Sequence, residues 1–250
     1  MIERFHNRVA LITGSGDVGV ATALRFLEES CKVALFDFNA AQMESLRQNE
    51  LKDFGPDRVL YITGDVTKLE DCERAVNETV AAFGKVDICF ATAGIARHHP
   101  IDEMSTEDWN SVIAVNLTGT FNIAKAVVPE MKKNEYGRIV FVSSLGGRTG
   151  RPGVGVNYAA SKAGVVGMTM LLGYELGPWN ITVNAIAPGP LAGRMTKSFP
   201  PEMVERLKAG ARIYRLGEMS EIAAAACYLA SDEASWTTGE VLDVNGGLFY

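Results

Sequence analysis

A chain of 250 residues with 47% hydrophobic and 22% charged residues is long enough to bury a substantial core, and no linker-like segment divides it. We therefore expect a single domain spanning residues 1–250. The formal net charge of -6, with no run of five or more Lys or Arg residues, excludes nucleic acid as an expected partner.

Short runs of β-branched residues alternate along the chain with amphipathic helical stretches. Strands are expected at Val9–Thr13, Lys32–Phe38, Arg58–Thr63, Val86–Ala91, Arg138–Ser143, Ile181–Ala187 and Glu240–Val244. Helices are expected at about 18–30, 40–54, 68–83, 105–134, 157–177 and 220–230. The alternation predicts an α/β fold, a Rossmann-like doubly wound parallel seven-stranded sheet with helices on both faces. Ligands of such sheets bind at the carboxyl ends of the strands.

A glycine-rich turn follows the first expected strand and opens a helix: Gly14-Ser15-Gly16-Asp17-Val18-Gly19. Glycines at this spacing allow a tight turn and a close approach of the backbone, so that amide groups at the helix N-terminus can receive a pyrophosphate. Such turns also occur where a chain merely reverses. Here the preceding strand and the following helix favour a dinucleotide site.

Asp37 ends the second expected strand, at the spacing from Gly14 where a carboxylate can accept hydrogen bonds from the adenosine ribose. A 2′-phosphate at that place would meet a like charge. The sequence therefore predicts NAD rather than NADP as the cofactor. The alternative is that Asp37 only forms a turn before Asn39.

Two further dipeptides fall just after successive expected strands. Asp65-Val66 follows the third strand and resembles a pair that holds the adenine ring, and Ala93-Gly94 follows the fourth and would let the backbone pass close to the cofactor. Each dipeptide is common in loops. Their positions at neighbouring strand ends favour cofactor binding.

A candidate catalytic group follows the fifth expected strand. Tyr158 and Lys162 are four residues apart on the next helix, so they lie on nearly the same face, and Ser144 lies at the strand end. A tyrosine with a pKa of about 10 becomes an effective proton carrier when positive charge favours its phenolate. Lys162 and an oxidised nicotinamide would supply that charge, while Ser144 would hold the substrate oxygen against Tyr158.

Asn116 is a polar residue within an apolar helical stretch, and a buried amide must be hydrogen bonded. It is either a core amide bonded to the backbone or the holder of a water that links Lys162 to solvent. The sequence leaves both roles open.

The four cysteines have no CxxC spacing: Cys31, Cys72, Cys89 and Cys227. This pattern is typical of reduced thiols in a core. No leader-like segment precedes the first expected strand, and the apolar runs are shorter than the roughly 18 residues of a membrane span. We therefore expect a cytoplasmic protein with no membrane partner.

Together these features resemble the short-chain dehydrogenase/reductase family over the whole chain. The matching residues are Thr13-Gly14 with Gly19, Asp65, Ala93-Gly94, Asn116, Ser144, Tyr158, Lys162, Asn184, Pro188-Gly189 and Gly246-Gly247. The resemblance implies a catalytic tetrad of Asn116, Ser144, Tyr158 and Lys162, with no metal needed for catalysis. Cofactor contacts by Gly14, Ser15, Gly16, Asp17, Val18, Asp37, Asp65, Val66, Ala93, Gly94, Tyr158, Lys162, Pro188, Gly189 and Leu191 are also implied, as is a homotetramer.

The chain departs from the family pattern at three places. Asp17-Val18-Gly19 stands where Gly-Ile-Gly is usual, so that a carboxylate lies near the pyrophosphate unless it serves as a helix N-cap. Ala91-Thr92-Ala93-Gly94 replaces Asn-Asn-Ala-Gly, which removes amides that brace the cofactor loop. Gly193 replaces a threonine that bonds the carboxamide, a role that Thr196 could take.

The resemblance implies an NAD-dependent oxidoreductase that transfers hydride between nicotinamide and a secondary alcohol or ketone, such as a polar hydroxy compound or sugar derivative. One alternative is a 3-oxoacyl-carrier-protein reductase, an enzyme that usually works with NADPH, against which Asp37 argues. Another is a catalytically silent NAD-binding regulator.

The small-molecule substrate is less defined. Arg148, Arg151 and Arg194 could each pair with an anionic group, or all three could be surface arginines. An apolar set would instead suit a hydrophobic ketone: Leu145, Leu191, Met195 and Phe199.

Overall fold

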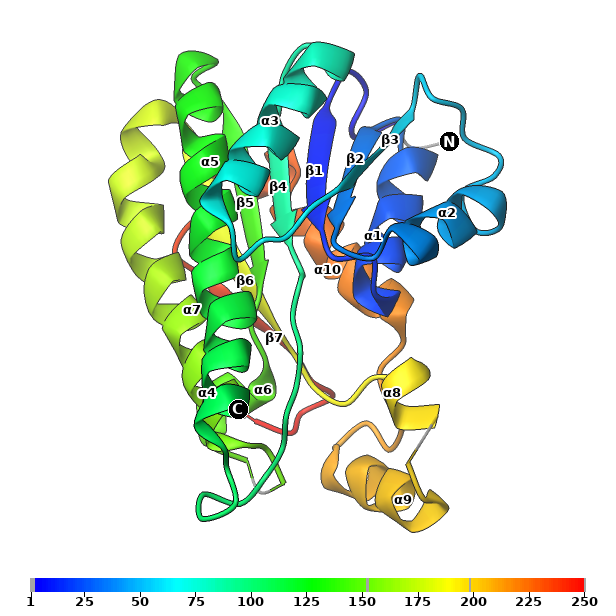
Figure 1. Ribbon diagram of the computed structural model, residues 1–250, viewed down its shortest axis with the longest axis vertical. Helices are drawn as coiled ribbons and strands as arrows, with labels where there is room; N and C mark the ends of the chain where they lie inside the picture. The colour runs from blue at the N-terminus through cyan, green and yellow to red at the C-terminus, as the bar shows by residue number, and fades with distance from the viewer. Residues whose placement is uncertain (1–2, 152, 198, 250) are drawn as a thin grey trace.

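One sheet of seven parallel strands forms the centre of the molecule, in the order β3-β2-β1-β4-β5-β6-β7 (Figure 1). The computed structural model describes residues 3–151, 153–197 and 199–249. The strands are β1 (Val9–Thr13), β2 (Lys32–Asp37), β3 (Val59–Thr63), β4 (Ile88–Ala91), β5 (Gly137–Val142), β6 (Ile181–Pro188) and β7 (Val241–Val244). The strand order reverses between β1 and β4, and the predicted Rossmann-like architecture is confirmed.

Helices cover both faces of the sheet (Figure 1). They are α1 (Asp17–Glu28), α2 (Ala40–Gln48), α3 (Leu69–Phe83), α4 (Thr106–Ile113), α5 (Gly119–Lys133), α6 (Leu145–Thr149), α7 (Val156–Leu176), α8 (Arg194–Lys197), α9 (Pro201–Gly210) and α10 (Met219–Leu229). A π-helical turn, Ala114–Thr118, joins α4 to α5, and short 3-10 turns lie at Gly177–Trp179 and Asp232–Ala234. The helices α1, α2 and α10 pack on one face, and α3, α5 and α7 pack on the other.

The two apolar layers follow from the alternation of side chains along each strand. In β1, Leu11 belongs to the core beneath α3, α5 and α7, whereas Ala10 and Ile12 belong to the core beneath α1, α2 and α10. All five residues of β1 are buried. Burial on both faces explains why the strands are nearly continuous in apolar residues.

The helix boundaries differ from the expectation in three places. The helix expected over 40–54 ends at Gln48, because the chain turns and buries Leu51. The expected helix over 105–134 is α4, the π-helical turn and α5 in succession. The helices α6, α8 and α9 were not expected: α6 lies in a glycine-rich stretch, and α8 and α9 are short and expose most of their residues.

By length and composition, the helical run Thr106–Lys133 is apolar enough to cross a membrane, contrary to the expectation that no apolar run is that long. Less than half of its most apolar window, 44%, is buried. Its buried residues include Val112, Ile123 and Val127, which pack in the protein's own core. The core helix of a soluble protein passes the same test, so this finding is weak evidence for a membrane segment.

A network of charged and aromatic side chains closes the amino-terminal edge of the sheet. Arg138, at the start of β5, is only 2% exposed and donates hydrogen bonds to three backbone carbonyl oxygens and to Asp232. The Tyr136 ring lies against the guanidinium groups of both Arg138 and Arg8, and Arg8 pairs with Asp87 at 3.4 Å. Asp87 in turn accepts a hydrogen bond from the backbone of β1.

Candidate active site

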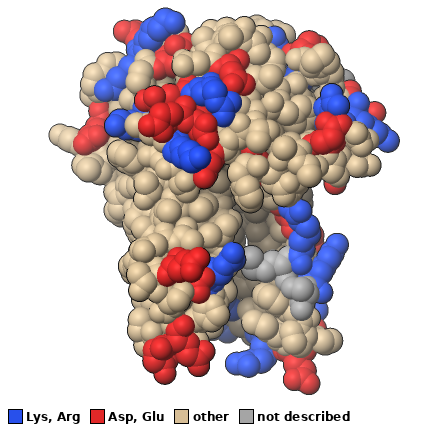
Figure 2. All heavy atoms as spheres, in the orientation of Figure 1, with Lys and Arg blue, Asp and Glu red and all other residues tan. Residues whose placement is uncertain are grey.

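A cavity of about 500 Å³ opens at the carboxyl ends of β1 to β4, where the strand order reverses. It is lined by seven of the fifteen predicted cofactor contacts: Gly14, Gly16, Asp37, Asp65, Val66, Ala93 and Gly94. In the same region Figure 2 shows the surface hollowed between the part over α4 and the part over α9. The predicted nucleotide contacts from four different strand ends therefore share one cavity.

The glycine turn is shaped by close backbone contacts that only glycine permits. Gly14 has φ of 89°, and a Cβ atom there would lie 2.8 Å from the amide nitrogen of Ala93. A Cβ atom at Gly19 would lie 2.0 Å from the carbonyl oxygen of Gly14. Gly16 is the N-cap of α1 and has no side chain to bond the amides of the first turn, which suits them to a phosphate.

Asp37 braces the glycine turn and also faces the cavity. Its Oδ2 accepts hydrogen bonds from the Ser15 amide at 2.6 Å and the Ser15 hydroxyl at 2.9 Å, and its Oδ1 accepts from the Asn39 amide at 2.8 Å. The turn-forming role that the sequence left open is therefore present. A carboxylate offers about four acceptor sites, so capacity for a ribose hydroxyl remains.

The dipeptide after β3 is held rigidly. Asp65 accepts a hydrogen bond from the Thr67 amide at 2.9 Å, and its own amide donates to Asp71 at 2.9 Å. The carbonyl oxygen of Val66 accepts from Asn122 of α5 at 2.9 Å. The side chain of Phe38 stands beside this end of the cavity and is 74% exposed.

The predicted catalytic side chains meet at the carboxyl end of β5. Ser144 is the N-cap of α6, accepts a hydrogen bond from the Gly146 amide at 3.1 Å, and lies close enough to Tyr158 to act on its pKa. Lys162 is 4% exposed and donates from Nζ to the carbonyl oxygen of Val142 at 2.7 Å. Its Nζ lies 5.8 Å from the centre of the Tyr158 ring.

Burial controls the protonation of these groups. It raises the pKa of Tyr158 above its usual value, although the nearby Ser144 side chain opposes the shift. It also lowers the pKa of Lys162 to about 8. Burial therefore favours the protonated phenol of Tyr158 at neutral pH.

Asn116 lies in the π-helical turn and is fully buried. Its Oδ1 accepts from the amide of Ile95 at 2.8 Å, and its Nδ2 donates to the carbonyl of Ile95 at 2.9 Å and to Ser161 at 3.2 Å. The amide therefore fixes the cofactor loop after β4 to α7. A Cβ atom at Gly94 would lie 3.3 Å from Asn116 and 3.6 Å from Nζ of Lys162, so the loop passes close to the catalytic lysine.

The site fits a nicotinamide dinucleotide. The glycine turn leaves the backbone at Gly16 open beside the N-terminus of α1, the Asp37 carboxylate lines the cavity as a hydrogen-bond acceptor, and the chain at Gly94 passes close to Lys162. Asp65 lines the same cavity as Gly94, and Lys162 close to Gly94 lies 5.8 Å from the centre of the Tyr158 ring.

Comparisons with known proteins agree with this geometry. Residues 14–249 match the family model described as enoyl-(acyl carrier protein) reductase. A 3-oxoacyl-[acyl-carrier-protein] reductase from Thermotoga maritima is 39% identical over 246 residues, which cover 98% of this chain and 99% of the relative. A reductase of the same name from Chlamydia muridarum is 37% identical over 243 residues, which cover 97% of each chain.

Solved structures give the same result. A 3-oxoacyl-[acyl-carrier protein] reductase from Brucella melitensis has a TM-score of 0.92 at 36% identity, covering 100% of this chain and 94% of that chain. A reductase from the same organism with bound NAD has a TM-score of 0.90 at 36% identity, with the same coverage. The chain belongs to the short-chain dehydrogenase/reductase family. The prediction of an oxidoreductase of this family is confirmed.

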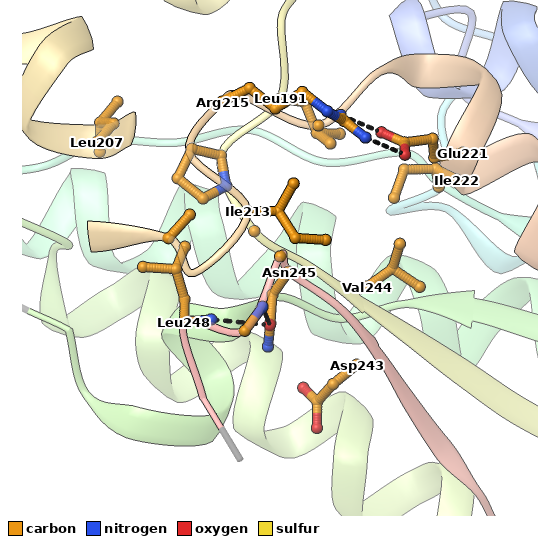
Figure 3. A pocket seen from close by; sticks show the side chains of 16 residues that line it. Leu191, Leu207, Ile213, Arg215, Glu221, Ile222, Asp243, Val244, Asn245 and Leu248 are labelled. Carbon is orange, nitrogen blue, oxygen red and sulfur yellow. Dashed lines mark hydrogen bonds and ion pairs between the residues drawn. The ribbon is translucent and has the colours of Figure 1, made fainter. Parts of the chain in front are cut away.

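Two more of the predicted cofactor contacts of this short-chain dehydrogenase/reductase line a different cavity, and six line neither: Ser15, Asp17, Val18, Tyr158, Lys162 and Pro188. A second cavity of about 300 Å³ lies between the ends of β6 and β7, α9 and the start of α10 (Figure 3). Gly189 and Leu191 line it, whereas Pro188 ends β6 beside it. Arg215 and Glu221 form a two-point ion pair on its wall, at 2.7 and 2.8 Å, and the guanidinium lowers the pKa of Glu221 to about 2 (Figure 3).

The three arginines considered for substrate binding have different surroundings. Arg148 pairs with Asp243 at 3.2 Å, and Arg194 pairs with Asp17. Arg151 is half-buried and forms no ion pair within the described part of the chain. Arg151 is therefore the one of the three whose charge is not neutralised by a described carboxylate.

The apolar set considered for a hydrophobic ketone is not gathered around one site. Leu145 is buried, with 4% exposed, and Leu191 lines the second cavity. Phe199 is half-buried, and the side chain of Met195 lies outside what the structure describes. These positions do not support a pocket built from the four residues.

Hydrogen bonds from other side chains support segments at or near the departures from the family pattern. The Thr13 hydroxyl accepts a hydrogen bond from the Ala93 amide at 3.4 Å and braces the cofactor loop. The hydroxyl of Thr196 accepts from the Gly193 amide at 3.0 Å and donates to the Leu191 carbonyl at 2.8 Å, which fixes its own turn. Asn184 is fully buried and bonds backbone groups near β7.

His98 is a site residue that the sequence analysis missed. Its ring meets the Tyr158 ring edge-on, with the ring centres 5.4 Å apart, and its Nδ1 accepts a hydrogen bond from the amide of Gly155 at 3.0 Å. Gly155 is the N-cap of α7, so His98 supports the helix turn that carries Tyr158. Burial lowers the pKa of His98, and the neutral ring is the form that can accept this bond. No local sequence pattern marks a contact between residues so far apart.

Proposed function

We propose that the protein reduces the keto group of a 3-oxoacyl thioester with a hydride from NADH. One observation carries the proposal. Ser144, Tyr158 and Lys162 lie at the end of β5 near the cavity proposed to hold the nucleotide, and the chain aligns over 98% of its length with a relative named as a 3-oxoacyl-[acyl-carrier-protein] reductase. Of the activities considered from the sequence, this one accounts for both features.

A dihydronicotinamide held at this site would supply the hydride that the carbonyl carbon accepts. Ser144 is placed to donate a hydrogen bond to the carbonyl oxygen, and Tyr158 donates its proton to the same oxygen. Because burial raises the pKa of Tyr158, the phenol is protonated at neutral pH, which is the form that reduction requires. Lys162, with a pKa of about 8, carries the positive charge that stabilises the phenolate left behind.

Asn116 fixes the spacing between the cofactor loop and α7 through its bonds to Ile95 and Ser161. We propose that it also orders a water that returns a proton to Tyr158 through Lys162. Support for this relay comes from the close approach of Gly94 to both Asn116 and Lys162.

The proposed preference for NADH over NADPH rests on Asp37. Its carboxylate faces the cavity at the ribose end, where it would bond a ribose diol and repel a 2′-phosphate. A structural relative with bound NAD supports the same choice. We expect kcat/KM to be at least about tenfold higher with NADH, which corresponds to about 1.4 kcal/mol.

The test is a cofactor and substrate matrix with purified protein. Acetoacetyl-CoA, its acyl-carrier-protein thioester and the enoyl thioester crotonyl-CoA are each offered with NADH and with NADPH, and nucleotide oxidation is followed. We expect oxidation with the two 3-oxo substrates and none with crotonyl-CoA. Turnover of crotonyl-CoA alone, or none with any 3-oxoacyl thioester, would overturn the proposal.

A second candidate is oxidation of a small anionic hydroxy compound with NAD. The observation that favours it is Arg151, a half-buried cation in the loop between Ser144 and Tyr158 with no described ion-pair partner. If this candidate is right, Arg151→Ala should raise KM for charged hydroxy acids and leave KM for neutral alcohols unchanged. A panel of hydroxy acids, sugar derivatives and alcohols with NAD distinguishes it from the thioester reductase.

We also propose that the protein is a cytoplasmic homotetramer. Exposed apolar side chains on the outer surfaces of α5 and α7 support assembly: Phe121, Met170, Leu171 and Tyr174. Light scattering checks the assembly, and a monomer at micromolar concentrations would refute it.

A further inference from the structure

Asp17 and Arg194 join two segments that are far apart in the sequence. Asp17 begins α1 directly after the glycine turn, and Arg194 begins α8 in the segment after β6. Oδ2 of Asp17 accepts a hydrogen bond from the Arg194 amide at 2.7 Å, and Oδ1 accepts from Nε of the same guanidinium at 2.5 Å. Both oxygens of the carboxylate are therefore bonded to one residue. The other suggested role of Asp17, as a helix N-cap, is not observed, since Gly16 is the N-cap.

The same contact connects two of the departures from the family pattern. A Cβ atom at Gly193 would lie 2.7 Å from Oδ2 of Asp17 and 2.4 Å from the methyl carbon of Met219. A threonine at position 193 would therefore require the Asp17 carboxylate and the end of the Met219 side chain to move. The acid at 17 and the glycine at 193 are thus in direct proximity.

Arg194 lies where it can reach a phosphate. One of its terminal nitrogens, Nη2, is 4.0 Å from the place where a Cβ atom on Gly16 would stand, so the guanidinium lies over the glycine turn. Only its Nε is used by Asp17, and the terminal nitrogens donate no hydrogen bond within the described residues. The Arg194 side chain is 61% exposed, which leaves it free to move.

We propose that Arg194 is a ligand of the cofactor pyrophosphate and that Asp17 holds it beside the glycine turn until the nucleotide arrives. The inference rests on the nucleotide site of the proposed function. When no phosphate is bound, the Asp17 carboxylate holds the Arg194 guanidinium. When the pyrophosphate binds at the N-terminus of α1, the guanidinium shares or transfers its hydrogen bonds to the phosphate oxygens.

The consequence is a link between nucleotide binding and the segment that carries α8 and α9. The Arg194 amide stays on Asp17 while its guanidinium reaches the phosphate, so the start of α8 remains fixed beside the glycine turn when nucleotide is bound. Asp17 also places a negative charge near the phosphates, which weakens nucleotide binding. The two residues therefore act on nucleotide affinity in opposite directions.

The test measures the Kd of ADP-ribose and of NADH by calorimetry for the wild type, Asp17→Asn, Arg194→Gln and the double variant. ADP-ribose carries the pyrophosphate without the nicotinamide, so it reports the phosphate contact independently of catalysis. Arg194→Gln should weaken binding about tenfold, and Asp17→Asn, which keeps an acceptor for the Arg194 amide, should tighten it about threefold. The loss in Arg194→Gln should shrink at high salt.

Lys197→Gln is the matched control, because Lys197 is an exposed cation of the same short helix. It should leave both Kd values unchanged. Equal weakening by Asp17→Asn and Arg194→Gln would mean a purely structural clamp and would overturn the proposal, as would unchanged affinity in Arg194→Gln. A wild type that binds neither NADH nor ADP-ribose would instead refute the nucleotide site itself.

A second cycle tests the coupling between positions 17 and 193. Gly193→Thr alone should weaken ADP-ribose binding, because its Cβ atom meets the Asp17 carboxylate. Adding Asp17→Gly should restore most of that affinity. Strictly additive effects of the two substitutions would show that the two departures are independent.

Discussion

Burial of the charged Lys162 amine lowers the free energy of unfolding of the nucleotide-free protein, by an amount that depends on pH. Replacing Lys162 with methionine should remove this pH dependence. Lys162 is a buried cation, and burial lowers its pKa from 10.5 to about 8. Below pH 8 the amine is charged in both the folded and the unfolded chain. The folded chain therefore bears the full free-energy cost of burying the charge in that pH range. At about 1.4 kcal/mol for each pKa unit, it amounts to about 3 kcal/mol.

The sign of the pH dependence follows from proton binding. Between pH 8 and 10.5 the unfolded chain binds the proton of this lysine and the folded chain releases it. The free energy of unfolding of the wild type therefore gains a contribution that rises with pH across this window. From pH 7 to 9.5 the gain is about 2 kcal/mol.

The assay is urea unfolding of the wild type and Lys162→Met at both pH values, at one protein concentration. Methionine also leaves the Val142 carbonyl without its donor, which costs about 1–3 kcal/mol but does not vary with pH. The wild type should therefore gain about 2 kcal/mol relative to the variant between the two pH values. Lys133→Met, at an exposed lysine, should show no such change. A difference between wild type and Lys162→Met that is independent of pH would refute the reasoning.

Three further predictions concern the site. Tyr158→Phe should retain less than about 1% of the turnover with little change in the Kd for NADH, because only the hydroxyl that transfers the proton is lost; higher residual activity would exclude that role. Asp37→Ser should raise kcat/KM with NADPH relative to NADH by about tenfold or more, and an unchanged cofactor ratio would contradict the assignment. His98→Phe should lower kcat about tenfold with nucleotide affinity retained, because the Gly155 amide loses its acceptor, whereas His98→Asn should recover part of kcat; equal losses in both variants would argue against the hydrogen bond.

Much of the fold could be predicted from the sequence because the sheet is buried on both faces. The strands are therefore continuous apolar runs, and β1 with all five residues buried is the clearest example. The segments that were missed have no such pattern. The helix α9 has no buried residue, so no apolar stripe marks it, and α6 lies in a stretch whose glycines allow close packing on α7.

In the candidate site, motifs within one stretch of sequence could be predicted, whereas contacts between segments far apart in the sequence could not. The glycine turn, Asp37 and the pair Tyr158 and Lys162 are recognisable because each depends on spacing within one strand and helix. The contact of His98 with Tyr158 depends on the fold bringing together segments about 60 residues apart, as does the bond between Asp17 and Arg194 across a still longer separation. Spacing alone cannot reveal such partners.

Mutations in the network around Arg138 should have different effects from mutations at the cavity at the other end of the sheet. It ties the amino edge of β5 to the segment after α10, at the end of the sheet opposite the cofactor cavity. Changes there should alter how firmly the strands are held without touching the candidate catalytic side chains at the other end of the sheet. Stability could therefore be adjusted from one edge of the sheet, and substrate choice from the other, with little interference between the two.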